Sequence, residues 1–175
     1  EPIRIDPKKI DEALVEYDVG SVLNVGAHTL TLDEWEYVMH HVHGAYQDEK
    51  SKTPIIYGID AIHGVNYTTG GTLFPQEIGL AATWNPSLAM QFGEVTAYET
   101  RASGIHWNFS PVLDLGRQPL WSRTFETLGE DPFLASEMGK AIINGYQGNK
   151  GVDSEHVAAC LKHFVGYSNP TSGRD

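Results

Sequence analysis

Cysteine is almost absent from this sequence, and basic residues are few. The 175 residues include one cysteine, Cys160, which excludes an intrachain disulfide framework and any metal site built only from cysteines. Twelve Lys and Arg residues stand against 23 Asp and Glu residues, so the formal net charge is −11. Because nucleic acids and anionic membrane surfaces repel such a chain, the composition argues against both as partners.

Other signals are missing as well. No apolar run approaches the roughly 20 residues of a membrane span, and residues 1–5 have neither the basic start nor the apolar core of a signal peptide. No initiator Met is present, and we expect both ends to be cuts through a longer protein. No Walker pattern occurs, and no strand is followed by G-x-G-x-x-G, so nucleotide binding has no support.

What the sequence does contain is a regular alternation of short apolar runs with amphipathic helices. We expect helices to open at Asp6-Pro7, Thr31, Asn85-Pro86 and Asp131-Pro132, which are residue pairs or capping residues typical of a first turn. Their predicted buried stripes are Ile10, Leu14 and Tyr17; Trp35, Val38, Met39 and Val42; Leu88, Phe92 and Val95; and Leu134, Met138, Ala141 and Ile142. The expected strands are residues 22–25, 55–59, 106–109 with a continuation to 113, and 157–165.

Strand–helix alternation of this kind predicts an α/β fold of parallel strands joined by right-handed crossovers. Two architectures fit, a (β/α)8 barrel or an open doubly wound sheet. A barrel usually needs about 250 residues, so four units would be roughly the first half of one. The loops that follow strands are long, at residues 60–84 and 114–130. In a barrel these loops emerge on the face that holds the active site.

Polar side chains gather where the predicted strands end. Asp60 and His63 follow the second strand, and the fourth strand contains Lys162 and His163. The loop after the third strand carries Asp114, Arg117, Trp121 and Arg123. Carboxylates accept from vicinal hydroxyls, cations donate to hydroxyl oxygens and an indole stacks on a sugar ring, so this set suits a polyhydroxylated ligand.

Each of these residues also has a plainer interpretation. Asp60 could cap a turn, and Arg123 could pair with Glu126 or Glu130. His163 could be a hydrogen-bonded core histidine, whereas Lys162 is harder to dismiss because lysine is almost never buried without a partner. Cys160 is expected to be a small core residue. The group His40, His41 and His43 does not have the spacing of metal ligands, so we expect an exposed helical face there.

Four segments together carry a resemblance to a known family. They are Tyr57-Gly58-Ile59-Asp60-Ala61-Ile62-His63-Gly64, Phe109-Ser110-Pro111-Val112-Leu113-Asp114, the stretch from Arg123 to Pro132, and Lys162-His163-Phe164. In order and spacing the sequence resembles glycoside hydrolase family 3, above all over residues 54–175. The resemblance implies an N-terminal (β/α)8 barrel, of which residues 1–175 would be an incomplete first part, the rest of the barrel and a C-terminal domain being absent.

The resemblance also implies an activity and a binding site. It places Asp60, Arg123, Lys162 and His163 around the non-reducing sugar in the −1 subsite of a retaining, exo-acting β-glucosidase. It implies that this segment contains no catalytic residue, because the nucleophile Asp and the acid/base Glu are expected beyond residue 175. The carboxylates Asp114, Glu126, Glu130 and Asp175 do not match the nucleophile motif. No metal and no organic cofactor is implied, and we expect the 175 residues alone to be inactive.

Glucose is the expected sugar. Family members that cleave N-acetylglucosamine follow Lys-His-Phe with a Pro-Gly-His-Gly type of loop, and here Val165-Gly166-Tyr167-Ser168 follows. Members acting on xylose or arabinose tend to carry Glu where Asp60 stands, and the shorter Asp leaves room for a hydroxymethyl group. The expected partners are a β-glucoside or gluco-oligosaccharide and the rest of the same polypeptide, without nucleic acid or membrane insertion. The expected location is secreted or periplasmic.

Three alternatives stay open at this point. The chain could be a non-catalytic sugar-binding or structural fragment, or a β-xylosidase-type member of the same family. It could also be a metal-dependent barrel hydrolase that uses His63, His106 and His163.

The adjacent residues Lys162 and His163 pose a geometric problem. In a regular strand, successive side chains point to opposite faces, so one of the two would turn away from the barrel mouth. The resemblance implies that both reach the sugar. We therefore predict a bulge, a bend or a non-proline cis peptide between Leu161 and Val165.

Overall fold

A computed structural model describes residues 3–26, 28–47 and 53–174 of the chain. Its helical elements are α1 (Pro7–Asp11), the π-helical turn η1 (Glu12–Glu16), α2 (Leu32–Gln47), α3 (Glu77–Ala81), α4 (Pro86–Ala102), the 3₁₀ turn η2 (Thr124–Glu126) and α5 (Pro132–Gln147). The strands are β1 (Ser21–Leu23), β2 (Ile56–Ile59), β3 (Trp107–Asn108) and β4 (Ala158–Ala159). In the described part of the chain, no helix is long and apolar enough to cross a bilayer.

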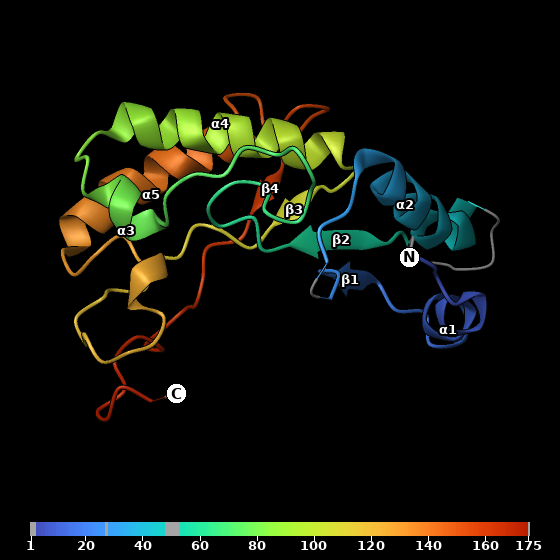
Figure 1. The fold of residues 1–175 in the computed structure, drawn as a ribbon, viewed down its shortest axis with the longest axis horizontal. Coiled ribbons are helices and arrows are strands. Elements are labelled where there is room, and N and C mark those ends of the chain that lie inside the picture. The colour runs from blue at the N-terminus through green and yellow to red at the C-terminus, as the bar shows by residue number, and fades with distance from the viewer. Residues whose placement is uncertain (1–2, 27, 48–52, 175) are drawn as a thin grey trace.

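Within these residues the strands form one parallel sheet in sequence order, β1-β2-β3-β4 (Figure 1). Val22 pairs with Tyr57, Gly58 with Trp107, and Asn108 with Ala159. Each strand is followed by at least one helix before the next strand begins. The α/β class and the parallel order predicted from the alternation are therefore confirmed.

Local capping chemistry places all four predicted helix starts where the sequence predicts them, including α1, where Asp6 accepts from Lys8 N at 3.0 Å. The Asn85 side chain accepts from Ser87 N at 3.0 Å, and Asp131 accepts from Phe133 N at 2.8 Å, each with proline in the first turn. At α2, Thr31 N donates to Glu34 Oε2 at 2.9 Å and Glu34 N donates to Thr31 Oγ1 at 3.3 Å. This reciprocal capping box satisfies backbone donors that have no partner inside the helix.

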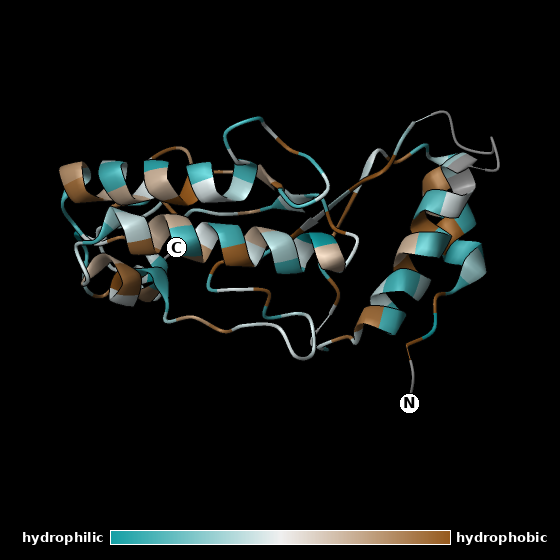
Figure 2. Cartoon of the chain, turned by 90° about the horizontal axis from the view of Figure 1, so that it is seen from above, coloured by the Kyte–Doolittle hydropathy of each residue, from teal (hydrophilic) through white to brown (hydrophobic). Residues whose placement is uncertain are grey.

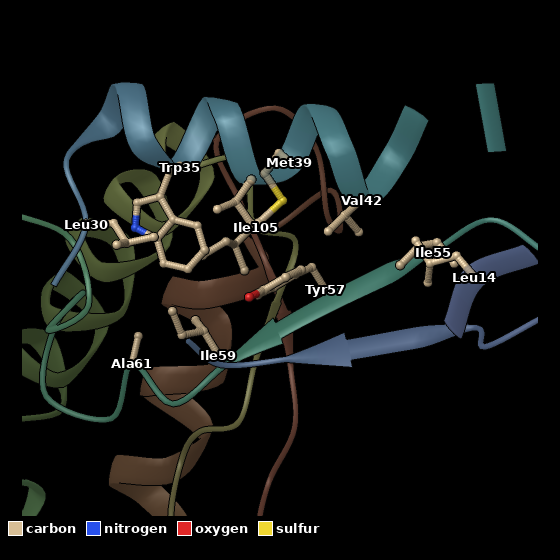
Figure 3. Packing of buried hydrophobic residues seen from close by; sticks show 11 residues of the cluster. Leu14, Leu30, Trp35, Met39, Val42, Ile55, Tyr57, Ile59, Ala61 and Ile105 are labelled. Atoms are coloured by element: carbon tan, nitrogen blue, oxygen red, sulfur yellow. The ribbon is translucent and has the colours of Figure 1, made fainter. Parts of the chain in front are cut away.

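A buried cluster joins α2 to the first two strands (Figure 3). Trp35, on α2, meets the ring of Tyr57, on β2, edge to face, with centroids 5.8 Å apart. Val38, Met39 and Val42 complete the predicted stripe and are all buried. Burial raises the pKa of Tyr57 to about 12, and its hydroxyl donates to Asn24 O at 2.6 Å. The cluster therefore fixes the carboxyl end of β1 as well as α2.

A second cluster lies between α4 and α5, which run side by side while α2 stands apart (Figure 2). The two helices approach closely at Gly93 and Gly145. A β-carbon on Gly145 would lie 2.2 Å from Met90 O, and one on Gly93 would lie 2.6 Å from Ile142 O. Glycine at both positions allows backbone contact that any side chain would prevent.

Three predicted buried positions are wrong. Leu88 and Val95 are 44% and 38% exposed, because α4 buries the neighbouring stripe of Ala89, Phe92, Gly93, Thr96, Ala97 and Thr100 instead. The close approach to α5 selects this small-residue face over the larger apolar side chains. Tyr17 is 69% exposed, because the helical segment ends at Glu16 and the chain turns away there.

Candidate functional site

A cleft of about 500 Å³ opens where the carboxyl ends of the strands meet the loop after β3. In a β/α barrel this is the face on which active sites are built. The four residues expected at the sugar site all line it. The full lining is Leu23, Asp60, Ile62, Phe109, Arg123, Glu126, Cys160, Lys162 and His163. Sequence reasoning therefore chose four residues that the fold brings together from three separate segments.

Asp60 follows β2 and lies at the centre of a hydrogen-bonded group. Its Oδ1 accepts from Lys162 Nζ at 2.5 Å, and its Oδ2 accepts from Asn24 Nδ2 at 2.8 Å. The Asp60 backbone N–H in turn donates to Asn24 Oδ1 at 3.0 Å. The Asp60 carboxylate thus has both oxygens engaged while its side chain remains 30% exposed, so a ligand can reach it.

Lys162 and His163 project from the segment that follows β4. The Lys162 side chain is only 14% exposed, and its ion pair with Asp60 compensates the burial of its charge. His163 is held by Asp114, whose Oδ2 accepts from His163 N at 2.8 Å and lies 2.7 Å from the ring Nδ1. With Nδ1 facing the buried Asp114 carboxylate, the other ring nitrogen, Nε2, carries the remaining hydrogen-bonding capacity of His163.

The Lys162–His163 peptide bond is cis, as is Phe164–Val165. Regular strand pairing ends at Ala159, and Lys162 makes an isolated parallel bridge with Val112. Both Lys162 and His163 line the cleft. The predicted break in strand alternation is therefore confirmed, and the strand expected over residues 157–165 is correspondingly short.

Arg123 lies at the start of η2, in the loop that follows β3. Its Nε donates to Glu126 Oε1, and the hydrogen bond raises the pKa of Arg123 above its ordinary value. The Glu126 side chain is 5% exposed and that of Arg123 28% exposed. The guanidinium also lies 5.4 Å from the ring centroid of Tyr167, within the range of a cation–π contact. The alternative in which Arg123 pairs with Glu126 is thus correct, and the pair still lines the cleft.

Other candidate residues lie elsewhere or face differently. Trp121 is 2% exposed and packs edge to face on Tyr167, so its ring offers no surface for a sugar to stack on. Arg117 lines a neighbouring pocket, not the cleft that holds Asp60. Cys160, expected in the core, is half-buried and lines the cleft, because β4 ends just before it.

The histidines do not converge. His63 Nδ1 lies 3.1 Å from Phe74 O, whereas the ring of His106 meets that of His43 at 5.4 Å. Among the described residues no group of three or more His, Cys, Asp or Glu side chains could hold a metal ion. His63, His106 and His163 are therefore not the metal-binding set that one alternative required. Of the three histidines expected on an exposed helical face, His40 is exposed, whereas His41 and His43 are half-buried, so that expectation is correct only for His40.

Sequence reasoning missed two groups that organise the site. Asn24 was overlooked because a lone asparagine at a strand end is common, although the end of β1 belongs to the same rim as Asp60. Asp114 was noticed as a carboxylate, but its role as the partner of His163 depends on a contact across 49 residues. The left-handed φ of 48° at Asn24, a conformation that Asn tolerates, was not readable from spacing.

The four parallel strands, the helices that follow the first three of them, and the polar cleft at their carboxyl ends define this chain as part of a (β/α)8 barrel. The chain belongs to glycoside hydrolase family 3: the family model described as "Glycosyl hydrolase family 3 N terminal domain" matches residues 4–175. The resemblance seen in the sequence is thereby confirmed, and the open doubly wound sheet is excluded.

Known relatives agree with this assignment. A lysosomal β-glucosidase of Dictyostelium discoideum is 48% identical over 130 residues, 71% of this chain and 16% of that protein. A periplasmic β-glucosidase/β-xylosidase of Dickeya chrysanthemi is 36% identical over 114 residues, 64% of this chain and 17% of that protein. The structure of an exo-1,3/1,4-β-glucanase from a Pseudoalteromonas species superposes with a TM-score of 0.85 at 30% identity, covering 97% of this chain and 22% of that one. The chain thus spans about a fifth or less of the length of these relatives.

Proposed function

We propose that the protein to which this chain belongs is a retaining, exo-acting β-glucosidase, and that this segment supplies its −1 sugar-binding subsite. The observation that carries the proposal is the convergence of Asp60, Arg123, Lys162 and His163 on one cleft at the active-site face of the barrel. We take residues 1–175 to be the N-terminal part of the barrel domain, with the remaining strands and a C-terminal domain supplied by the rest of the polypeptide.

The chemistry of these side chains suits a sugar held by its hydroxyl groups. A carboxylate can accept from two hydroxyls at once, and Asp60 keeps lone pairs in addition to those used by Lys162 and Asn24. Lys162 and Arg123 donate to hydroxyl oxygens through charge-assisted hydrogen bonds. His163, oriented by Asp114, adds a polar contact of fixed direction.

The displacement itself requires groups from outside this segment. A retaining glycosidase uses a carboxylate nucleophile and a carboxyl acid/base about 5–5.5 Å apart. In this proposal both come from the later part of the polypeptide, and Asp114 and Glu126 have other duties, as the partners of His163 and Arg123. Asp175 lies outside the described residues. Neither a metal nor an organic cofactor has a place in this scheme.

A β-xylosidase is the second candidate, because one relative carries both activities in its name. We favour glucose because the short Asp60 side chain leaves space for the hydroxymethyl group that xylose lacks. A secreted or periplasmic location fits the periplasmic relative. The two substrates are separated by measuring kcat/KM of the full-length protein on p-nitrophenyl β-glucoside and p-nitrophenyl β-xyloside. Faster turnover of the xyloside would overturn the choice of glucose. If the protein turns over neither substrate, the proposed glycoside hydrolase activity is wrong.

The same measurement on the isolated 175-residue chain tests whether the nucleophile and the acid/base come from outside this segment. We expect no turnover, because the displacing carboxyl groups are not part of it. Turnover that scales with the concentration of the purified chain would refute this division. Unchanged activity of the full-length protein after chelator treatment is expected, and its loss would favour a metal-dependent hydrolase.

A further inference from the structure

Glu77, in the first turn of α3, is a buried carboxyl group with no part in the proposed sugar contacts. Its side chain has no exposed surface. Taking an acid out of water is unfavourable unless hydrogen bonds or charges compensate it. Glu77 does not line the cleft, so any effect of this residue on the sugar site must act through the residues that it contacts.

Three elements meet at this carboxyl group. The backbone N–H of Val112 donates to both oxygens of Glu77, at 3.3 and 3.1 Å, and Ser110 Oγ donates to Oε1 at 3.1 Å. Ser110 Oγ also lies 2.9 Å from the hydroxyl of Tyr146, on α5. Glu77 therefore ties α3 to the segment that leaves β3, and Ser110 joins the same segment to α5.

The segment held by Glu77 is also the one that sets the backbone of Lys162. Val112 and Lys162 form a parallel bridge, Leu113 N donates to Lys162 O at 2.8 Å, and Lys162 N donates to Pro111 O at 3.1 Å. Two residues beyond Val112 comes Asp114, which orients His163. A shift of the 110–113 segment would thus move two residues of the cleft together.

We infer that Glu77 is a positioning residue for the sugar site: its carboxyl group anchors residues 110–113, and through them the backbone of Lys162 and the Asp114–His163 pair. The inference rests on the proposed function. It assigns Glu77 an effect on sugar affinity without any contact with the sugar.

The charges around Glu77 indicate its protonation state. Burial, aided by the nearby Glu126 carboxylate, raises the pKa of Glu77 well above its ordinary value. The hydrogen bonds from Val112 and Ser110 and the charge of Lys162 act in the opposite direction but do not cancel the burial. Tyr146, the α5 residue bonded to Ser110, has its own pKa raised by burial, whereas Glu137 and Lys140 of α5 pair with each other on the exposed side. The raised pKa means that the fold favours the protonated form of Glu77 more than water does, and a glutamine resembles that form in shape and charge.

The decisive experiment compares Glu77→Leu with Glu77→Gln in the full-length protein. We expect Glu77→Leu to raise KM for p-nitrophenyl β-glucoside at least about tenfold, measured well below its Tm, because Val112 N and Ser110 Oγ lose their acceptor. Glu77→Gln keeps one acceptor oxygen and should stay within about threefold of the wild type. Met39→Ala, in the separate cluster on α2, controls for general destabilisation: it should lower Tm and leave KM unchanged. A Glu77→Leu variant whose KM matches that of Met39→Ala would overturn the positioning role.

A second readout holds even if Glu77→Leu fails to fold. A raised pKa in the folded state gives stability that is fully present below the unfolded pKa and is lost as pH rises through the folded pKa. Glutamine does not titrate, so the Tm of Glu77→Gln relative to the wild type should increase as pH rises above about 4.5. A Tm difference that does not change with pH would refute the raised pKa of the buried Glu77.

The outcomes also separate this inference from the proposed function. A wild-type protein that neither binds nor cleaves a glycoside overturns both. An active wild type with an unaffected Glu77→Leu variant overturns the positioning role alone.

Discussion

The two charged pairs that line the cleft are assembled in opposite ways. Arg123 and Glu126 are three residues apart on one 3₁₀ turn, so a short loop brings them together. Asp60 and Lys162 are 102 residues apart and meet because parallel strands deliver both to one rim. The local pair needs only the conformation of its own turn. The long-range pair can form only after the parallel strands have assembled.

The pairs also differ in their surroundings. Asp60 has Asn24 as a second partner, and its side chain is 30% exposed, so a ligand can replace the water that contacts it. Glu126 is 5% exposed and forms its ion pair with Arg123. We therefore expect the long-range pair to act mainly on binding, and the local pair to act on stability as well as through the proposed contact of Arg123 with the sugar.

The largest effect is expected from Asp60→Ala. Asp60→Ala removes a charged acceptor of hydrogen bonds from the sugar. It should cost about 3 kcal/mol or more of transition-state stabilisation, which lowers kcat/KM of the full-length protein on an aryl β-glucoside roughly 100-fold. Asp153→Ala, which removes an exposed carboxylate on the loop after α5, is the matched control and should leave kcat/KM unchanged. If Asp60→Ala barely changes kcat/KM, the sugar site is wrongly assigned.

Arg123→Met should lower stability in addition to removing the proposed contact of Arg123 with the sugar. It leaves the Glu126 carboxylate buried without its counter-charge, and we expect a loss of about 2 kcal/mol in the free energy of unfolding, less than for a fully buried pair because Arg123 is partly exposed. The double variant Arg123→Met/Glu126→Gln removes both charges and should recover most of that loss in chemical denaturation. Equal stabilities of the single and double variants would show that Glu126 does not depend on Arg123.

A smaller effect is expected from Asn24→Gly. The substitution removes the side-chain contacts with Asp60 but tolerates the left-handed φ of this position. Because Asp60 keeps Lys162 as a partner, the loss of transition-state stabilisation should be about 1 kcal/mol, so kcat/KM should fall roughly fivefold. A fall as large as that of Asp60→Ala would mean that Asn24 itself touches the substrate.

The smallest effect is expected from Phe125→Ala, on the same turn as Arg123 and Glu126. Phe125 is 48% exposed, and surface substitutions of this kind usually change stability by less than about 0.5 kcal/mol. Unchanged kcat/KM and Tm would show that the turn acts through its ion pair alone. A clear loss of activity would place Phe125 in a contact with substrate or with the rest of the protein.

Much of the fold was predictable because its signals are local. The caps at Asn85 and Asp131 and the capping box at Thr31 act within three residues, so their helices begin where the sequence predicts. The burial of α4 was not predictable in the same way. Apolarity alone favours Leu88 and Val95, but the close contact of Gly93 with α5 turns the smaller residues inward.

The candidate site divides along the same line. By itself, the sequence determined which residue types stand at the strand ends, since Asp60 follows one apolar run and Lys162 and His163 interrupt another. It also determined the backbone problem at Lys162 and His163, because alternation of side chains is a property of any strand. The partners of these residues were decided only by the tertiary structure. Asn24 beside Asp60, Asp114 beside His163 and Glu77 beside Val112 are all joined across 35 residues or more. Spacing along a chain does not show which buried polar groups will contact one another, because those contacts depend on the order and register of the parallel strands.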